Sequence, residues 1–360
     1  MNLSPYFLQT LSWVKFWKKA SNKNHDYKLF EDQNYYTFVY EYPWKLKQKF
    51  WYIPKGPILK KSRNLTNNTN QSNNQDYKLD YKLELKNFLE QIIKEAKQNN
   101  ICFIKIDFDD TLTKALDYKS IDDYFNYLKQ SFPCLLIINK SKKIQYLQAT
   151  VCDLSHQPKQ DLESDNLVTF YENNQPFWSK TNQQVKRYTK KILKEFESGK
   201  YSYSFEKSDA NFQAFWEIHD STTKRQQFST QPKEYLHQMM LEEFGTICVI
   251  YNKDNQPASV FLGVMLDGCL YYILGGNSEN GMKERTQYLL QAVVIRHARL
   301  NQCNYYDMGG YSEGSGYSIF KDGYRGEFRE FLGPIDLVIK PNTYKGINNC
   351  LKIFRKIRNL

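Results

Sequence analysis

The sequence predicts a mixed α/β (α+β) protein. Segments with strand character alternate with segments of helical periodicity along the chain, and a second alternation of this kind begins near residue 160. The length of 360 residues suits two domains of ordinary size, or one large one. With 41% hydrophobic and 16% aromatic residues, the chain has enough apolar surface to bury a sizeable core.

The first part of the chain shows a βα alternation without an internal repeat. Its polar tract at 60–75 is poor in apolar residues and predicts a loop. The expected ordered segments are a helix over 8–18, strands over 35–42 and 50–53, a helix with apolar positions from 85 to 96, and a buried strand over 101–106.

The second part follows a more definite order. The expected segments are a short strand over 167–171, helices over 184–197, 211–223 and 235–241, strands over 247–251, 258–266 and 269–274, a long helix over 285–300, and a strand over 304–308. The turn at 254–257 indicates a hairpin. Three strands, a helix and a strand resemble the core of an acetyltransferase (GNAT-type) domain, although many α+β domains share that order.

Charge and cysteine content restrict the function classes. The net charge of +11 favours polyanionic partners such as nucleic acid, nucleotide sugars or an anionic membrane face, or reflects only the abundance of Lys along the chain. The seven cysteines form no CxxC pair, which argues against a disulfide framework and a zinc site. We therefore expect small core cysteines in a reducing compartment and no bound metal.

The sequence also predicts a soluble, cytoplasmic protein. The first twenty residues lack a charged region followed by a clean apolar block, as an export signal would have. The longest apolar run, at 259–266, has the length of a strand and cannot span a bilayer. Peripheral contact with a membrane surface stays open.

The segment 305–326 is the most informative part of the sequence. After a short strand, Gly309, Gly310, Gly314 and Gly316 follow in quick succession and allow backbone N–H groups to approach an anionic or carbonyl ligand. Lys321 then places an ammonium group beside a further flexible turn, where it suits a phosphate or a developing oxyanion. The alternative is a surface loop with a solvated lysine.

The same segment resembles the C-terminal signature of the Fem family. The resemblance rests on Tyr-Asp-x-Gly-Gly at 306–310, on Gly-Tyr-Ser-Ile-Phe-Lys-Asp-Gly-Tyr-Arg-Gly-Glu at 316–327, and on Gly-Pro-Ile-Asp-Leu-Val at 333–338. Members of this family build peptidoglycan cross-bridges by transferring an amino acid from aminoacyl-tRNA to a muramyl-pentapeptide precursor, either nucleotide-linked or lipid-linked.

Other segments are similar to elements of that family in the same order. They are Phe-Leu-Gln-Thr at 7–10 with the aromatic residues that follow, Tyr-Ile-Pro-Lys-Gly-Pro at 52–57, Thr-Lys-Arg-Gln-Gln-Phe at 223–228, Gly-Gly-Asn at 275–277 and Tyr-Leu-Leu-Gln at 288–291. The resemblance implies two GNAT-like domains, 1–160 with 334–360 and 161–333. The single helix at 184–197 and the lack of a long heptad insertion imply the type without a helical arm.

The resemblance also implies residue roles. Lys18, or else Lys15, matches a basic residue that contacts the diphosphate of the precursor, and Arg225 matches an arginine that contacts the same group. Lys321 matches the lysine near the transfer site, where it would hold the tRNA-linked ester or its 3′-terminal phosphate and offset the charge of the tetrahedral intermediate.

Six further residues complete the expected site. Tyr272 is the candidate catalytic hydroxyl near the acceptor amine, and Tyr271 is the alternative, although strand tyrosines more often pack in a core. Residues expected to bind substrate are Gly309, Gly310, Tyr317 and Phe320.

Several kinds of chemistry are not indicated. The five histidines lie in no recognisable motif, so a covalent intermediate is not suggested, and positioning with electrostatic stabilisation would supply the rate. The acidic run Asp107, Asp109 and Asp110 is expected to serve turn and capping roles. No cofactor is expected besides aminoacyl-tRNA as the donor, and we expect a monomer.

Two other functions remain as alternatives. A GNAT-type acyl-CoA N-acyltransferase acting on a sugar or amine is the first, although the segment 275–282 lacks the Arg/Gln-x-x-Gly-x-Gly/Ala loop that usually binds the pyrophosphate of coenzyme A. A non-catalytic nucleic-acid or cell-wall binding module is the second, and it leaves the Gly-Lys-Gly segment unexplained.

Overall fold

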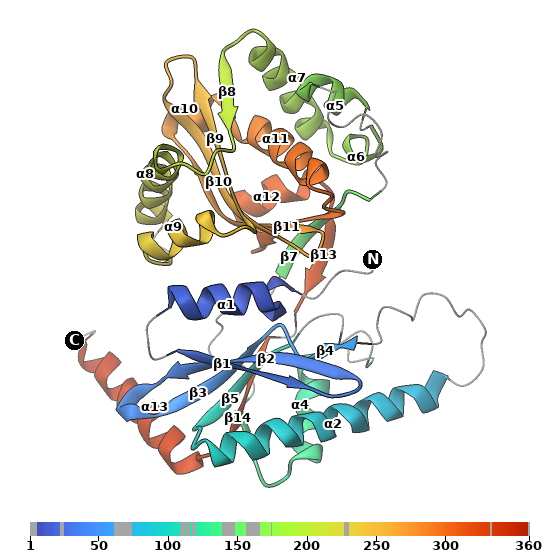
Figure 1. Cartoon of the computed structure of the whole chain (residues 1–360), viewed down its shortest axis with the longest axis vertical. Coiled ribbons are helices and arrows are strands. Elements are labelled where there is room, and N and C mark those ends of the chain that lie inside the picture. The colour runs from blue at the N-terminus through green and yellow to red at the C-terminus, as the bar shows by residue number, and fades with distance from the viewer. Residues whose placement is uncertain are drawn as a thin grey trace. The chain divides into compact units, whose positions relative to one another are not determined.

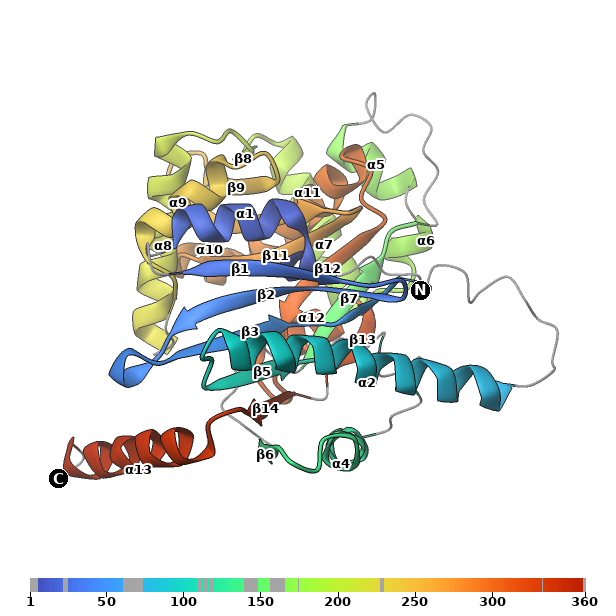
Figure 2. The ribbon, with the colours of Figure 1, turned by 60° about the horizontal axis from the view of Figure 1, so that its bottom comes forward.

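The computed structural model describes residues 6–21, 25–60, 74–108, 112, 116, 120–138, 148–155, 166–173, 175–226, 230–331 and 333–358. The chain divides into two compact units, Met1–Leu147 with Glu330–Leu360, and Gln148–Arg329. The first boundary lies before 160 because β7 (Gln148–Asp153) pairs with β12 (Tyr305–Gly310) in the sheet of the second unit. Figures 1 and 2 show the elements of each unit.

The first unit is built around a mixed sheet in the order β1-β2-β3-β5-β14-β6, with β4 paired to β2. Strands β3 and β5 are parallel neighbours, and β14 returns from the end of the chain to pair antiparallel with β5. The strands are β1 (Asp26–Glu31), β2 (Tyr35–Pro43), β3 (Lys49–Pro54), β4 (Ile58–Leu59), β5 (Phe103–Asp107), β6 (Leu136–Ile138) and β14 (Pro334–Val338).

Helices cover this sheet with apolar faces that match their sequence periodicity. In α2 (Asn74–Gln98), the residues Leu85, Phe88, Leu89 and Ile92 are buried against the strands, as the helical spacing predicts. The other helical elements are η1 (Phe7–Gln9), α1 (Leu11–Ala20), η2 (Lys45–Lys47), α4 (Ile121–Ser131) and α13 (Pro341–Arg358). The Thr10 side chain caps α1 by accepting a hydrogen bond from the Trp13 N–H.

The second unit contains the order that the sequence predicts. Its sheet runs β13-β7-β12-β11-β10-β9-β8, in which β9, β10 and β11 are antiparallel and β11 is parallel to β12. The strands not yet bounded are β8 (Tyr201–Ser204), β9 (Gly245–Asn252), β10 (Pro257–Leu266), β11 (Cys269–Asn277) and β13 (Glu327–Glu330).

Helices lie on both faces of this second sheet (Figure 1). α8 (Asp209–Gln226) and α9 (Lys233–Leu241) cover one face, and α11 (Gln287–Leu300) covers the other. α7 (Gln183–Glu197) packs against α11 in the same core cluster. It therefore does not project from the unit as one helix of an arm. The remaining helices are α5 (Leu167–Asn173), α6 (Gln175–Trp178), α10 (Glu279–Glu284) and α12 (Gly316–Asp322).

One expectation about local structure is wrong. The segment predicted as a strand at 167–171 forms α5, in which Leu167 and Phe170 are buried three residues apart on one helical face. The glycine-rich segment is not loop throughout, because Ser315 caps α12 by accepting a hydrogen bond from the Ser318 N–H. Most of the polar tract at 60–75 lies outside the described residues.

The fold class is confirmed as mixed α/β with two sheets. Five of the seven cysteines are buried and all seven are free thiols, as expected of core residues. Across the described part of the chain, no helix is long and apolar enough to cross a bilayer.

Candidate active site

The parallel strands β11 and β12 run side by side for only part of their length. Their register pairs Cys269 with Tyr305 and ends where Tyr271 meets Asp307. β11 continues to Asn277 along β10, while β12 continues along β7 with an irregularity between Asp307 and Gly310. The carboxyl ends of the two strands therefore diverge, and β11 and β12 no longer pair with each other there. This leaves backbone groups of β11 available to a ligand at this edge.

Gly309 makes the irregularity in β12. Its φ of +78° is a conformation that L side chains rarely adopt, and its N–H donates a hydrogen bond of 2.7 Å to Asp307 Oδ1. A Cβ placed on Gly309 would lie 2.8 Å from the carbonyl oxygen of Tyr272. Both the backbone angle and the close approach of the two strands require glycine here.

Lys321 reaches this bulge from α12. Its Nζ donates a hydrogen bond of 2.5 Å to the carbonyl oxygen of Gly310 and lies 5.2 Å from the ring centroid of Tyr317. Burial lowers the pKa of Lys321 to about 8, and the nearby Asp307 carboxylate opposes that shift. The half-buried side chain therefore sits over the Gly309–Gly310 backbone and is still mainly an ammonium group near neutral pH, although it loses its proton more readily than a solvated lysine does.

This geometry suits the stabilisation of negative charge. An ammonium group has three N–H donors, and the Gly310 carbonyl takes one of them. The other two have no partner among the described residues and remain available to an oxyanion or a phosphate. In a partly dehydrated site such a donor acts more strongly than in water.

Most of the residues predicted from the glycine-rich segment gather around Lys321. Gly309 and Gly310 form the bulge beneath it, and Tyr317 is 47% exposed beside it. Phe320 packs edge-on against Tyr288, with ring centroids 5.2 Å apart, and so anchors α12 to α11. The role predicted for Phe320 in binding substrate is untested, but the structure gives it a packing role.

The two tyrosines of β11 differ in their surroundings. Successive residues of β11 face opposite sides of the sheet, so Tyr271 and Tyr272 cannot line the same site. Tyr271 is buried, and burial together with Cys269 and Asp307 raises the pKa of its hydroxyl. Tyr272 is half-buried, packs on Phe261 and ends against Gly275, in the part of β11 that no longer pairs with β12. Tyr272 is therefore the better placed of the two.

The three basic residues predicted to hold a diphosphate are exposed. Arg225 lies in the last turn of α8, and Thr222 one turn earlier approaches Gly276 near the carboxyl end of β11. Lys18 and Lys15 are on α1 in the first unit. Lys18 forms an ion pair of 2.7 Å with Asp26, and this hydrogen bond raises the pKa of the lysine.

The expectation that Asp107 serves a turn or cap is wrong. Asp107 is 1% exposed at the end of β5, 3.5 Å from Lys55 Nζ, and accepts a hydrogen bond of 3.3 Å from the Tyr52 hydroxyl. Burial raises the pKa of the Asp107 carboxyl, and Lys55 opposes that shift. Asp109 and Asp110 lie outside the described residues.

Sequence reasoning also missed Asp307, which is 1% exposed and shapes the Gly309 bulge. Its signal was the single acidic residue in the otherwise apolar strand before the two glycines. Asp307 and Asp107 occupy the same place in their units, at the end of a parallel strand pair. In the first unit the neighbouring cation, Lys55, is fully buried, whereas Lys321 is partly exposed and accessible.

Comparison with known proteins supports this fold. Residues 179–322 match the model of the acetyltransferase (GNAT) domain. The crystal structure of FemX superimposes with a TM-score of 0.68 at 15% identity, covering 95% of this chain and 94% of that one. No curated protein matches the sequence.

Two further structures are more distant. L-PGS from Bacillus licheniformis has a TM-score of 0.47 at 12% identity, covering 87% of this chain and 84% of that one. The C-terminal domain of a putative lysylphosphatidylglycerol synthetase from Agrobacterium fabrum has a TM-score of 0.49 at 8% identity, covering 91% and 88%. Neither similarity is strong enough to guide an argument. The chain has a Fem-type fold of two GNAT-like units, and most of its second unit matches the model of the acetyltransferase (GNAT) domain.

Proposed function

We propose that this protein is an aminoacyltransferase that moves an amino acid from aminoacyl-tRNA to the peptide stem of a muramyl-pentapeptide precursor. One observation carries the proposal: the Lys321 ammonium group is held over the Gly309–Gly310 bulge, at the point where β11 and β12 diverge. The Fem-type fold and the GNAT domain support the coarser statement that the protein is a transferase.

The reaction requires little covalent chemistry from the protein. The acceptor amine attacks the ester carbonyl, a C–N bond forms, and the C–O bond to the terminal ribose breaks. Negative charge develops on the carbonyl oxygen and then on the leaving ribose oxygen, and Lys321 is placed to offset it. The proton lost by the amine needs an acceptor, to which we assign no residue. No cofactor takes part besides the donor itself, and the reaction proceeds in the cytoplasm.

The test is transfer from a panel of charged tRNAs to both the nucleotide-linked and the lipid-linked precursor. We expect labelled product with at least one donor, and its absence with all twenty would remove the proposal for standard amino acids. The variant Lys321→Ala is expected to lower kcat about 100-fold with an unchanged thermal midpoint. The control is Lys253→Ala, which removes a lysine that is exposed in the β9–β10 turn.

An acyl-CoA N-acyltransferase is the second candidate, favoured by the acetyltransferase domain match over 179–322. The short helix α10 occupies the connection where the pyrophosphate loop of such enzymes usually opens the long helix. Gly281 there would bring a Cβ to 2.0 Å from the Ala258 carbonyl oxygen, so the connection packs tightly on β10. Micromolar binding of coenzyme A by calorimetry would favour this second candidate over the first.

A further inference from the structure

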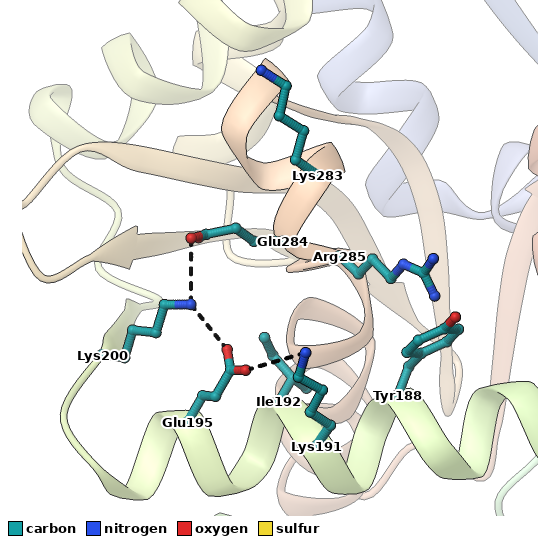
Figure 3. Close-up of a pocket in the computed structure, with 8 residues that line it drawn as sticks. All are labelled: Tyr188, Lys191, Ile192, Glu195, Lys200, Lys283, Glu284 and Arg285. Atoms are coloured by element: carbon teal, nitrogen blue, oxygen red, sulfur yellow. Dashed lines mark hydrogen bonds and ion pairs between the residues drawn. The ribbon is translucent and has the colours of Figure 1, made fainter.

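A second feature of the GNAT-type unit lies outside the Lys321 site. It is a cavity of about 400 Å³ between α7 and α10, next to the start of β8 (Figure 3). Its lining residues are Tyr188, Lys191, Ile192, Glu195, Lys200, Lys283, Glu284 and Arg285. We call it the α7–α10 cavity. Its lining is mostly polar and charged, unlike that of a pocket for an apolar ligand.

The cavity carries an excess of positive charge. Four of its lining residues are cations and two are carboxylates. Glu195 is paired with Lys200 at 3.1 Å and with Lys191 at 3.7 Å, and Glu284 is paired with Lys200 at 3.3 Å. Both carboxylates are therefore already neutralised within the cavity, which leaves its net positive charge to attract an anion.

Arg285 is the cation of the cavity that is best placed to bind an anion. It ends α10 in a left-handed conformation, with φ of +64°, and its guanidinium carbon lies 3.7 Å from the ring centroid of Tyr188 (Figure 3). Arg187 approaches the same ring at 4.7 Å and donates a hydrogen bond of 2.8 Å to the Tyr188 hydroxyl. Two guanidinium groups held against one half-buried ring form a preordered surface for a phosphate.

Aromatic side chains connect the α7–α10 cavity to the Lys321 site. The ring centroids of Tyr188 and Tyr288 are 5.2 Å apart, and those of Tyr288 and Phe320 are also 5.2 Å apart. Phe320 directly precedes Lys321. The rings of Tyr188 and Phe320 are thus separated by at most roughly 10 Å, a span of no more than about three stacked nucleotides in a single strand.

We propose that the α7–α10 cavity binds the phosphate backbone of the donor RNA, no more than about three nucleotides before its 3′ ester. This inference rests on the proposed function for the position of the ester at Lys321. It assigns the phosphate contacts to Arg285 and Arg187, and to Tyr188 the positioning of both guanidinium groups. The unpaired 3′ end of a tRNA has the flexibility and the charge spacing to span this distance.

The first test measures binding of an uncharged, fluorescein-labelled, single-stranded RNA hexamer ending in CCA. We expect Arg285→Ala to weaken binding about tenfold and to reduce the slope of log affinity against log salt by about 0.7, the value for one lost phosphate contact. Tyr188→Leu should weaken binding with an unchanged salt slope. Lys253→Ala, which removes the same charge from an exposed turn, should bind as the wild type does.

Wild-type affinity and salt slope in Arg285→Ala would overturn the inference. The inference would also be overturned if coenzyme A or the nucleotide-linked precursor displaced the RNA and Arg285→Ala lost affinity for that competitor. The cavity would then hold a different diphosphate. Thermal midpoints of all variants are measured to exclude loss of folding.

A second test uses aminoacylated donors of increasing length. Transfer from an aminoacylated mononucleotide should be insensitive to Arg285→Ala, and transfer from an aminoacylated hexamer should fall about tenfold. Equal effects on both donors would contradict the inference. The two proposals fail separately: binding of the RNA in the cavity without transfer refutes the proposed function alone, and transfer that ignores Arg285 refutes the cavity assignment alone.

Discussion

Lys321 combines two properties that rarely occur together in a surface lysine. Its Nζ is fixed by the Gly310 carbonyl, and burial lowers its pKa to about 8. Lys55 in the first unit is also held beside a strand-end aspartate, but it is fully buried between Asp107 and the ring of Phe331, 3.5 Å from the ring centroid. Burial without access makes Lys55 structural, and partial access makes Lys321 a candidate for catalysis.

The pH dependence of transfer tests the role of Lys321. If the ammonium form offsets negative charge, kcat/KM falls as pH rises through about 8, because the lysine loses its proton there. Lys321→Arg keeps its charge at all accessible pH values, so the alkaline fall should disappear even if the rate is lower. A rate that instead rises through this range in the wild type, and is abolished in the arginine variant, would identify Lys321 as a general base.

At the scale of elements, the β12 bulge determines where Lys321 can act. The bulge turns the Gly310 carbonyl toward α12, and the Ser315 cap begins that helix so that Lys321 falls in its last turn. Gly309 and Gly314 share nearly the same left-handed φ, +78° and +76°. They differ in their surroundings, because a Cβ on Gly314 would meet nothing within 4 Å.

This pair of glycines allows the cost of the bulge to be measured. Gly314→Ala should reveal the backbone strain alone, about 1–2 kcal/mol in the free energy of unfolding. Gly309→Ala adds the clash with the Tyr272 carbonyl, so its denaturation midpoint should fall further and its transfer rate should fall as well. Equal losses of stability and full transfer activity in Gly309→Ala would show that the strands do not need to approach so closely.

At the scale of the whole molecule, the chain closes its first unit with its last strand. β14 lies between β5 and β6, and the buried ion pair of Lys105 with Asp336, at 2.6 Å, ties the two distant segments together. The Tyr344 hydroxyl of α13 also donates a hydrogen bond of 2.7 Å to Asp336. The second unit is thereby inserted as a continuous segment between two parts of the first.

Breaking this closing contact should be costly. Lys105→Met leaves the Asp336 carboxylate buried without its cation, so we expect a loss of about 3–5 kcal/mol in the free energy of unfolding by urea denaturation. Lys28→Met removes an ion pair of the same length, 2.6 Å, to Glu95, but both side chains are more than a third exposed, so the loss should stay below about 1 kcal/mol. Similar losses in the two variants would contradict a special role for the buried pair.

Much of the fold follows from local patterns in the sequence. Apolar periodicity located α7, α8 and α11 and the strands β9 to β12 to within a few residues, because each helix buries one continuous face and each strand buries one face or both. For α2 it located only the second half, because the first turns lack the apolar spacing. The resemblance of 305–326 to the Fem signature identified the segment that contains the bulge and Lys321. The exception, α5, is short enough for its apolar residues to fit either a strand or a helix.

What only the tertiary structure decided concerns residues that meet from distant segments. The sequence by itself determined which residues can carry charge near the two glycines, but not that Tyr271 is buried while Tyr272 is half-buried, or that Asp107 is paired with Lys55. It determined that 184–197 is a basic helix and that Arg285 precedes the long helix, yet the α7–α10 cavity exists only because those segments pack together. The burial of a side chain, its pKa and its access to solvent depend on packing between distant segments, whereas apolar periodicity shows only which face of an element is buried.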